Sequence, residues 1–495
     1  MKKNIFLYLL SIGLISILPS CELTLEPYNG KSTETILSTA EGVEAATLGN
    51  YSNLKGNDYA KNLHILTEYP SDNLILSGTT TSHLFFAYNY QHIENMLPTA
   101  QFWLKAYKII YGANVIIENV EEGKTPALNQ LLGENYFLRA MAHFDLVTLF
   151  GRPYSQGQGN NPGVMIRKDV DVKALPPRNT VKEVYDFVIS DLTKAASLMT
   201  LPKNSSFASK EVAYALLSRV YLFKEDNAMA IEYANKVINS TRYSLMATEA
   251  YKKYFTIANE SNPETIFAIK HVAVDDMAKG AIGSLYYSQN GAGWGEMYAS
   301  ESYRALLDKN PTDARQSFVE PVYIKNAQGA ITYDAGGNPV LEKRNGYSKY
   351  YINKYSWQEG LQTLSSPVYL RLAELYLIRA EANAKLGNLQ AALDDVNVIR
   401  KRAGLSGEAL YKPDDLKGNP SVLAVVLAEK RLELAFEGQR KYDLFRNNLP
   451  LVRDYAGFHL ISGQTIQTIP ASSPRAIYFI PQKELLVNPN LTQNP

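Results

Sequence analysis

The stretch 366–404, SPVYLRLAELYLIRAEANAKLGNLQAALDDVNVIRKRAG, constrains the fold most, because it encodes two amphipathic helices joined at a glycine. The first helix places charged residues on one stripe: Arg371, Glu374, Glu381 and Lys385. Its opposite face carries small and apolar residues, and Gly387 can end it in the left-handed conformation. Ala380 and Ala392 are small residues twelve positions apart on either side of the turn. The pattern predicts two antiparallel helices in close contact.

A second segment repeats this arrangement, since Ser218 and Ala230 within 208–240 are again twelve positions apart around a turn. A third hairpin is predicted within 102–150. This is the spacing of tetratricopeptide repeats, in which small residues let paired helices approach closely. The alternative is a set of ordinary helical hairpins without repeat ancestry. Because the hairpins are not contiguous, we do not expect an uninterrupted solenoid.

The N-terminus has the layout of a secretion signal. Lys2 and Lys3 precede an apolar run that is too short to cross a bilayer, and the run ends at Leu18-Pro19-Ser20-Cys21. Cys21 is the only cysteine, so no disulfide can form within the chain. The pattern resembles a bacterial lipobox, which predicts a signal peptide over 1–20 and a lipidated Cys21. The alternative is a plain signal peptide followed by a chance cysteine.

The mature chain is predicted to be mainly α-helical, with a lipidated tether over 21–35 and one large domain over 36–495. Periodicity changes along that domain. A tetratricopeptide-like helical half is expected from about 36–58, 99–240 and 367–446. An irregular, loop-rich half with short β-hairpins is expected mainly over 59–98 and 243–366, including a strand within 264–274 and a hairpin over 322–341. Residues 447–495 are predicted to form an extended C-terminal cover.

Searches for catalytic and metal-binding patterns point to no enzyme. The six histidines show no ligand spacing, and the chain has no phosphate loop, nucleophile elbow or dinucleotide fingerprint. Asp394 and Asp395 are adjacent, but we expect them on the solvent side of a helix. His143 and Asp145 are expected to be satisfied polar groups in a helix buried on most sides. A net charge of +1 gives no reason to expect nucleic acid as a partner. We predict a non-enzyme without cofactor or metal.

Four stretches together resemble the SusD/RagB family of nutrient-binding surface lipoproteins from Bacteroidetes: NYFLRAMAHFDLVTLFG, LRLAELYLIRAEA, EKRLELAFEGQRKYDLFR and IPQKELLVNPNLTQNP. The resemblance covers nearly the whole chain. It implies that Arg440, Asp443 and Arg446 are structural.

The resemblance also implies a partner and a location. The helical half would dock on a TonB-dependent transporter of the SusC type, for which the protein would act as lid and capture module. Only Glu22 and Glu26 follow Cys21 closely, so an outer-membrane position facing the cell exterior is implied by the family and not by an acidic export signal.

Two hypotheses of function stay open. In the first, the protein captures an oligosaccharide and delivers it to the transporter. In the second, it is a peptide- or protein-binding scaffold without glycan binding. The glycine- and aromatic-rich loop 280–298 favours the first, because sugars bind flat apolar platforms with polar groups nearby.

Trp294 is the central residue predicted for that platform, since it lies between glycines in a stretch without periodicity. The other candidates are aromatic residues from the same loop and from two further ones: Tyr286, Tyr287, Tyr298, Phe86, Tyr88, Tyr90 and Trp357. The alternative is that Trp294 fills a small core within the irregular half.

Overall fold

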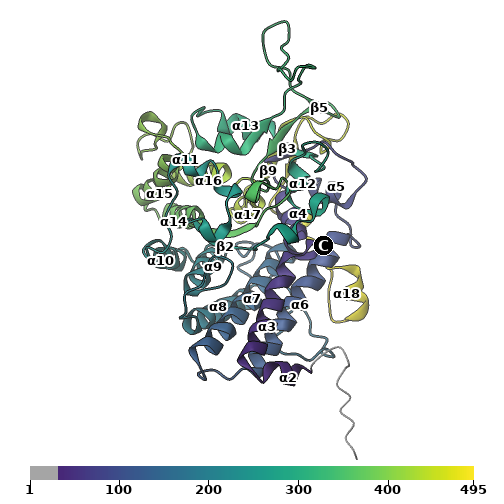
Figure 1. The fold of residues 1–495 in the computed structure, drawn as a ribbon, viewed down its shortest axis with the longest axis vertical. Helices are drawn as coiled ribbons and strands as arrows, with labels where there is room; N and C mark the ends of the chain where they lie inside the picture. The colour runs from purple at the N-terminus through teal and green to yellow at the C-terminus, as the bar shows by residue number, and fades with distance from the viewer. Residues whose placement is uncertain (1–31) are drawn as a thin grey trace, which may run out of the picture.

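The computed structural model describes residues 32–495 (Figure 1). The predicted signal peptide, Cys21 and most of the predicted tether lie outside the described residues. Long helices fill the lower half and the left flank of Figure 1, whereas short elements and loops fill its upper right part. The longer helices are α3 (Ala40–Lys55), α6 (Leu97–Asn119), α7 (Pro126–Phe150), α8 (Val181–Leu198), α9 (Lys210–Phe223), α10 (Asn227–Ile238), α14 (Leu372–Lys385), α15 (Leu389–Arg402) and α16 (Val422–Glu433). The fold is mainly α, as predicted.

The predicted helical hairpins are present as α6–α7, α9–α10 and α14–α15. In the second hairpin the hydroxyl of Ser218 donates to the carbonyl of Ala230 at 2.9 Å, so the two small residues lie at the helix crossing. In the third, Ala380 and Ala392 are fully buried in one apolar cluster. Gly387 between these helices has φ 83°, a conformation in which a side chain would be strained.

The hairpins form one continuous stack in space, and in this respect the expectation of an interrupted array was wrong. Helix α10 packs directly on α14, where Leu222 and Ala230 share a buried cluster with Ile378 and Ala382. The chain between them leaves the stack and returns to it. Strand β2 (Thr265–Ala268) pairs antiparallel with β8 (Val368–Arg371) immediately before α14. An interruption in the sequence is therefore not an interruption in the packing.

The segment 59–98, predicted as loops, contains more helix than expected. A π-helical turn (Asn57–Lys61) leads into α4 (Asn62–Glu68), and α5 (His83–Tyr88) follows β1 (Leu74–Leu76). Six of the seven α4 residues are buried. A helix covered on nearly every side has no polar face, and thus no periodic pattern for sequence analysis to detect.

The upper part of the molecule is built from short two-stranded ladders, whose strands besides β1 are β3 (Met297–Ala299), β4 (Val319–Pro321), β5 (Lys343–Arg344), β6 (Tyr347–Ser348), β7 (Tyr350–Ile352), β9 (Leu451–Arg453) and β10 (Gln467–Ile469). The shorter α-helices of the molecule are α2 (Thr33–Leu37), α11 (Thr248–Tyr251), α12 (Gly283–Tyr286), α13 (Glu301–Leu307), α17 (Arg440–Phe445) and α18 (Gln482–Val487). Of the strand predicted within 264–274, only β2 forms.

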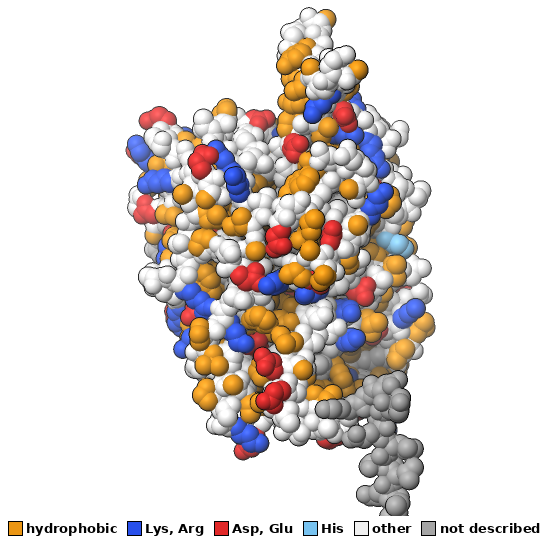
Figure 2. Space-filling model, in the orientation of Figure 1, with side chains coloured by type: hydrophobic (Ala, Val, Ile, Leu, Met, Phe, Trp, Pro, Cys, Tyr) orange, Lys and Arg blue, Asp and Glu red, His pale blue; other side chains and the backbone are white. Residues whose placement is uncertain are grey.

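The hairpin predicted over 322–341 is confirmed as an arm that projects above β5 (Figure 1). Its base pairs Tyr323 with Leu341, and its tip divides into two turns that bridge Lys325 to Ile331 and Tyr333 to Pro339. Hydrophobic side chains lie on this arm in Figure 2, and the ring of Tyr333 is 62% exposed. Elsewhere on the same face, acidic and basic side chains are interspersed without an extended area of one sign (Figure 2).

The end of the chain packs against the helical body. The backbone N–H of Tyr478 donates to the carbonyl of Leu149. The side-chain amide of Asn494 donates to the carbonyl of Phe150 at 2.8 Å. These bonds satisfy carbonyls at the C-terminal end of α7 that no helical N–H can reach.

Candidate functional site

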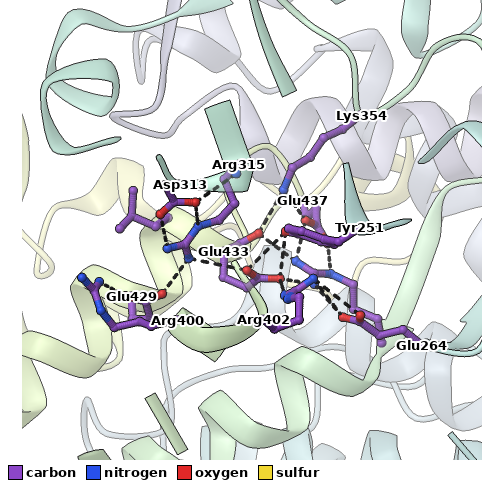
Figure 3. A network of polar contacts seen from close by, with 12 residues as sticks. Tyr251, Glu264, Asp313, Arg315, Lys354, Arg400, Arg402, Glu429, Glu433 and Glu437 are labelled. Carbon is purple, nitrogen blue, oxygen red and sulfur yellow. Dashed lines mark hydrogen bonds and ion pairs between the residues drawn. The ribbon is translucent and has the colours of Figure 1, made fainter. Parts of the chain in front are cut away.

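Most charged residues of the stretch 429–446 are buried or nearly so and form ion pairs, and Figure 3 shows the pairs made by Glu429, Glu433 and Glu437. One network joins five carboxylates to five cations: Glu264, Asp313, Glu429, Glu433 and Glu437 with Arg315, Lys354, Arg371, Arg400 and Arg402. Burial alone would raise the pKa of Glu433, but the guanidinium groups of Arg402 and Arg371 hold it well below its usual range. The network is neutral as a whole, and its members come from both the helical half and the irregular half of the molecule.

A second buried cluster contains the residues that most resemble an active constellation. Lys430 donates to Glu381 at 2.9 Å and to Asp443 at 2.6 Å, and Arg446 pairs with both carboxylates. Arg440 instead binds the carboxylate of Asp72. The structural role implied for Asp443, Arg440 and Arg446 is consistent with these contacts.

The charged face expected in the opening hairpin is also buried. Arg371, Glu374 and Glu381 are at most 4% exposed and belong to ion pairs with other helices and loops. Asp395, expected on the solvent side, is 5% exposed and binds Arg379 at 2.7 Å. That expectation was wrong for Asp395. A charged side chain can be buried when a side chain of opposite charge on a neighbouring helix pairs with it.

Trp294 is held at the surface by a tightly built loop. The backbone N–H groups of Trp294 and Gly295 both donate to the carbonyl of Ser284 on α12, at 2.7 and 2.9 Å. A Cβ added at Gly293 would lie 2.0 Å from the carbonyl oxygen of Tyr287, so only glycine fits there. The loop is therefore ordered by close backbone contact, and it directs the Trp294 side chain outward.

The indole of Trp294 is 51% exposed, and polar groups surround it. Its Nε1–H donates to the carbonyl of Lys279 at 3.0 Å, while the Lys279 ammonium lies 5.0 Å from the ring centroid. Arg344 donates to the Trp294 carbonyl at 2.8 Å and approaches Glu296 at 3.9 Å. The result is a fixed aromatic surface with the Lys279 ammonium over the ring and Arg344 bound to the backbone of Trp294, whereas Glu296 is only 8% exposed.

Lys279, Glu296 and Arg344 were missed by sequence analysis. Arg344 follows the projecting arm, fifty positions beyond Trp294, and no spacing rule connects the two. Lys279 lies just before the predicted loop, but its charge alone did not distinguish it from other surface lysines.

Five predicted platform residues are buried, and the prediction is wrong for them: Tyr286, Tyr287, Tyr298, Tyr88 and Tyr90. Tyr286 is fully buried, with its hydroxyl 2.6 Å from Nε2 of His64, and Tyr298 is fully buried on β3. Tyr88 contacts Nδ1 of His459 at 2.9 Å, and Tyr90 donates to the carbonyl of Pro70. A tyrosine can fill a core when its hydroxyl finds a partner, as the hydroxyls of Tyr286, Tyr88 and Tyr90 do.

The remaining candidates divide into two places. Tyr287 is 7% exposed and packs edge-on against the half-buried Trp357, with ring centroids 5.9 Å apart. Phe86 is partly exposed on α5 beside His83, with ring centroids 6.1 Å apart. Trp294, Trp357 and Phe86 therefore keep accessible ring surface, and they are the candidates that remain from the prediction.

Within residues 32–495, no cluster of three or more His, Cys, Asp or Glu side chains is arranged to hold a metal ion. In the same residues, no helix has the length and hydropathy needed to span a membrane.

Comparison with known proteins gives consistent matches over nearly the whole chain. A family model described as "SusD family" matches residues 228–495, and one described as "Starch-binding associating with outer membrane" matches residues 25–222. SusD-like protein P2 of Formosa agariphila is 26% identical, and the match covers 97% of each chain.

Solved structures share the fold. A SusD superfamily protein of Bacteroides thetaiotaomicron is 27% identical with a TM-score of 0.79, covering 92% of this chain and 100% of that one. A putative sugar binding protein of Bacteroides vulgatus is 28% identical with a TM-score of 0.78, covering 92% of this chain and 98% of that one.

Proposed function

Since this chain belongs to the SusD family, we propose that it is a surface lipoprotein that captures an oligosaccharide and delivers it to a TonB-dependent transporter of the SusC type. The observation that carries the binding role is the half-exposed ring of Trp294, fixed at its edge and flanked by Lys279 and Arg344. Sugar rings present apolar C–H faces and polar hydroxyl rims, which match an aromatic face with charged hydrogen-bonding groups around it. The similar Bacteroides vulgatus protein is named a putative sugar binding protein, which supports the same ligand class.

Titration calorimetry of the mature protein against a panel of soluble oligosaccharides and peptides tests the binding role. Replacing Trp294 with alanine should weaken binding of the active glycan by roughly 1–3 kcal/mol, by analogy with base stacking on aromatic side chains. That energy corresponds to roughly 5- to 150-fold in Kd. The melting temperature should change little, because half of the side chain is already in water.

Tyr111→Ala is the matched control, since Tyr111 is an exposed aromatic residue of α6 in the helical half and is 45% exposed. It should leave glycan affinity unchanged. Binding of peptides alone would replace the oligosaccharide proposal with the scaffold hypothesis. A large fall in melting temperature with unaltered affinity in the Trp294 variant would assign that residue to packing.

The helical half is the proposed docking surface for the transporter. Leu97, Leu104 and Tyr111 recur every seven residues along α6 and are 54%, 67% and 45% exposed, which gives this helix an apolar outer stripe. Mild detergent extraction should co-purify a β-barrel partner in near-equal amount.

Cys21→Ala should release the protein from membranes that lack the transporter, and retention there would contradict the lipid anchor.

A further inference from the structure

A pocket of about 80 Å³ lies where the helical and the irregular half of the molecule meet, and Trp294 is not part of its lining. Its walls come from α4, α7, α9, β8 and α17, which approach one another near the centre of the molecule (Figure 1). Aromatic side chains make up much of the lining: Phe144, Phe223, Tyr355, Tyr369 and Tyr442. Asp145 is the carboxylate in the lining that takes part in no ion pair, and it is 5% exposed.

The state of Asp145 is unusual for this protein. Its two oxygens accept hydrogen bonds from the hydroxyls of Tyr59 and Tyr369, each at 2.7 Å, and no ion pair joins it to a lysine, arginine or histidine among the described residues. Nearly every other buried carboxylate in residues 32–495 has a cationic partner within 4.0 Å, including Asp72, Asp191, Glu374 and Asp443.

The one other buried carboxylate without an ion pair in the described chain is Glu68, and it lies beside the same pocket. Glu68 accepts from the backbone N–H of Gly438 at 2.8 Å, and Gly438 lines the pocket. The two unpaired carboxylates are therefore gathered around one pocket in a protein that otherwise pairs its buried charges. Burying a charge without a partner of opposite charge lowers the stability of the fold. The position of these carboxylates beside a pocket therefore points to a function other than stability.

Two further polar groups line the pocket. The buried hydroxyl of Tyr442 makes no hydrogen bond of ordinary geometry, although the hydroxyl of Thr148 lies near it. Arg219 also lines the pocket, but Glu374 neutralises it through bonds of 2.6 and 2.8 Å. Burial raises the pKa of Asp145 to about 6, so at neutral pH the carboxylate is charged and desolvated without a counter-ion.

We propose that this pocket binds the ammonium group of a small organic amine, with Asp145 as the counter-ion and the aromatic side chains around it as walls. A carboxylate supplies the opposite charge, and aromatic rings attract cations through their electron-rich faces. A dry cavity of about 150 Å³ takes a benzene ring, so a pocket of about 80 Å³ has room for roughly three non-hydrogen atoms, which is enough for the ammonium end of a small amine. The site is separate from the proposed glycan platform and does not depend on it.

Ethanolamine and ethylene glycol form a suitable pair of probes, because both have four non-hydrogen atoms and only the first is a cation at pH 7.5. Ethanolamine hydrochloride should raise the melting temperature of the mature protein by roughly 1–2 °C at ten times its Kd. Ethylene glycol and an equal concentration of sodium chloride should not. Equal shifts from ethanolamine and sodium chloride would overturn the proposal. The absence of a shift with ethanolamine up to 100 mM would also overturn it. The concentration limit is set this high because a ligand of about four non-hydrogen atoms is expected to bind weakly.

Asp145→Asn should abolish the response to ethanolamine, whereas Asp394→Asn, which removes an exposed carboxylate, should retain it. Because Asp145→Asn also alters the hydrogen bonds from Tyr59 and Tyr369, a second variant is needed. Leu63→Phe fills the pocket and leaves the carboxylate in place, and it should abolish the response as well. A response that persists in either variant would place the amine elsewhere and refute the assignment.

Discussion

Glu433→Gln is the most informative test of the buried ion-pair network. The Glu433 side chain is fully buried and lies among Arg315, Arg371 and Arg402. Removing its charge leaves the neutral network with one excess positive charge in the interior. Breaking a buried pair in this way costs about 3–5 kcal/mol. With an unfolding entropy of about 2.1 cal/mol/K per residue, a chain of this length loses roughly 1 °C per kcal/mol. The melting temperature should therefore fall by about 3–5 °C.

Differential scanning calorimetry at pH 7.5 measures this shift, and Glu408→Gln provides the control. The Glu408 side chain is 99% exposed and approaches Lys417 only at 3.9 Å, so its replacement should leave the melting temperature within about 1 °C. The double variant Glu433→Gln with Arg402→Met restores neutrality and should recover part of the loss. A Glu433→Gln variant as stable as the parent would refute the charge-balance reasoning. A double variant whose loss of stability exceeds the sum of the losses in the two single variants would also refute it.

The pH dependence of the same variant follows from the sign of the pKa shift. The pKa of Glu433 is lower in the folded than in the unfolded chain, so its charge contributes stability above about pH 4, and this contribution is lost as the pH falls further. The difference between the parent and Glu433→Gln should thus shrink progressively below about pH 4.

Two further substitutions test other parts of the structure. Lys441 is buried with its ammonium 3.3 Å from the Leu66 carbonyl, and burial lowers its pKa to about 7. Between about pH 7 and 10 the side chain therefore holds a proton in the unfolded chain that it does not hold in the folded chain. Stability should rise with pH over this range, and Lys441→Met should raise the urea midpoint at pH 7 and flatten the rise, whereas the exposed Lys483→Met should do neither. Gly293→Ala places a Cβ 2.0 Å from the Tyr287 carbonyl oxygen and should displace the Trp294 loop, so glycan affinity measured by calorimetry should fall although the tryptophan remains; unchanged affinity would separate loop geometry from binding.

Local sequence patterns were sufficient where a segment has one apolar and one polar face. The helical hairpins within 366–404 and 208–240 and the hairpin over 322–341 could all be predicted, because each depends on residues close together in the chain. Helix α4 could not, since burial on nearly every side removes the periodicity that identifies a helix.

The site was harder to predict, for a related reason. Trp294 lies in a glycine-rich stretch and is exposed, but Tyr286 and Tyr298 occur in the same stretch and are buried. Sequence alone did not separate these cases, because a tyrosine suits both surface and core. Asp395 shows the same ambiguity for charge, since its partner Arg379 is on the neighbouring helix and makes an apparently solvated position an interior one.

The return of the chain at the β2–β8 ladder has a consequence for the order of folding. Helices α10 and α14 are neighbours in the stack, yet about 130 residues separate Ile238 from Leu372. Closing a loop of that length instead of a five-residue turn costs roughly 3 kcal/mol more in chain entropy. The hairpins from α6 to α10 can assemble from local contacts, whereas α14 and α15 must wait until the intervening chain has collapsed enough to bring β8 to β2. We therefore expect the last two helices of the stack to join in a late, slower kinetic phase.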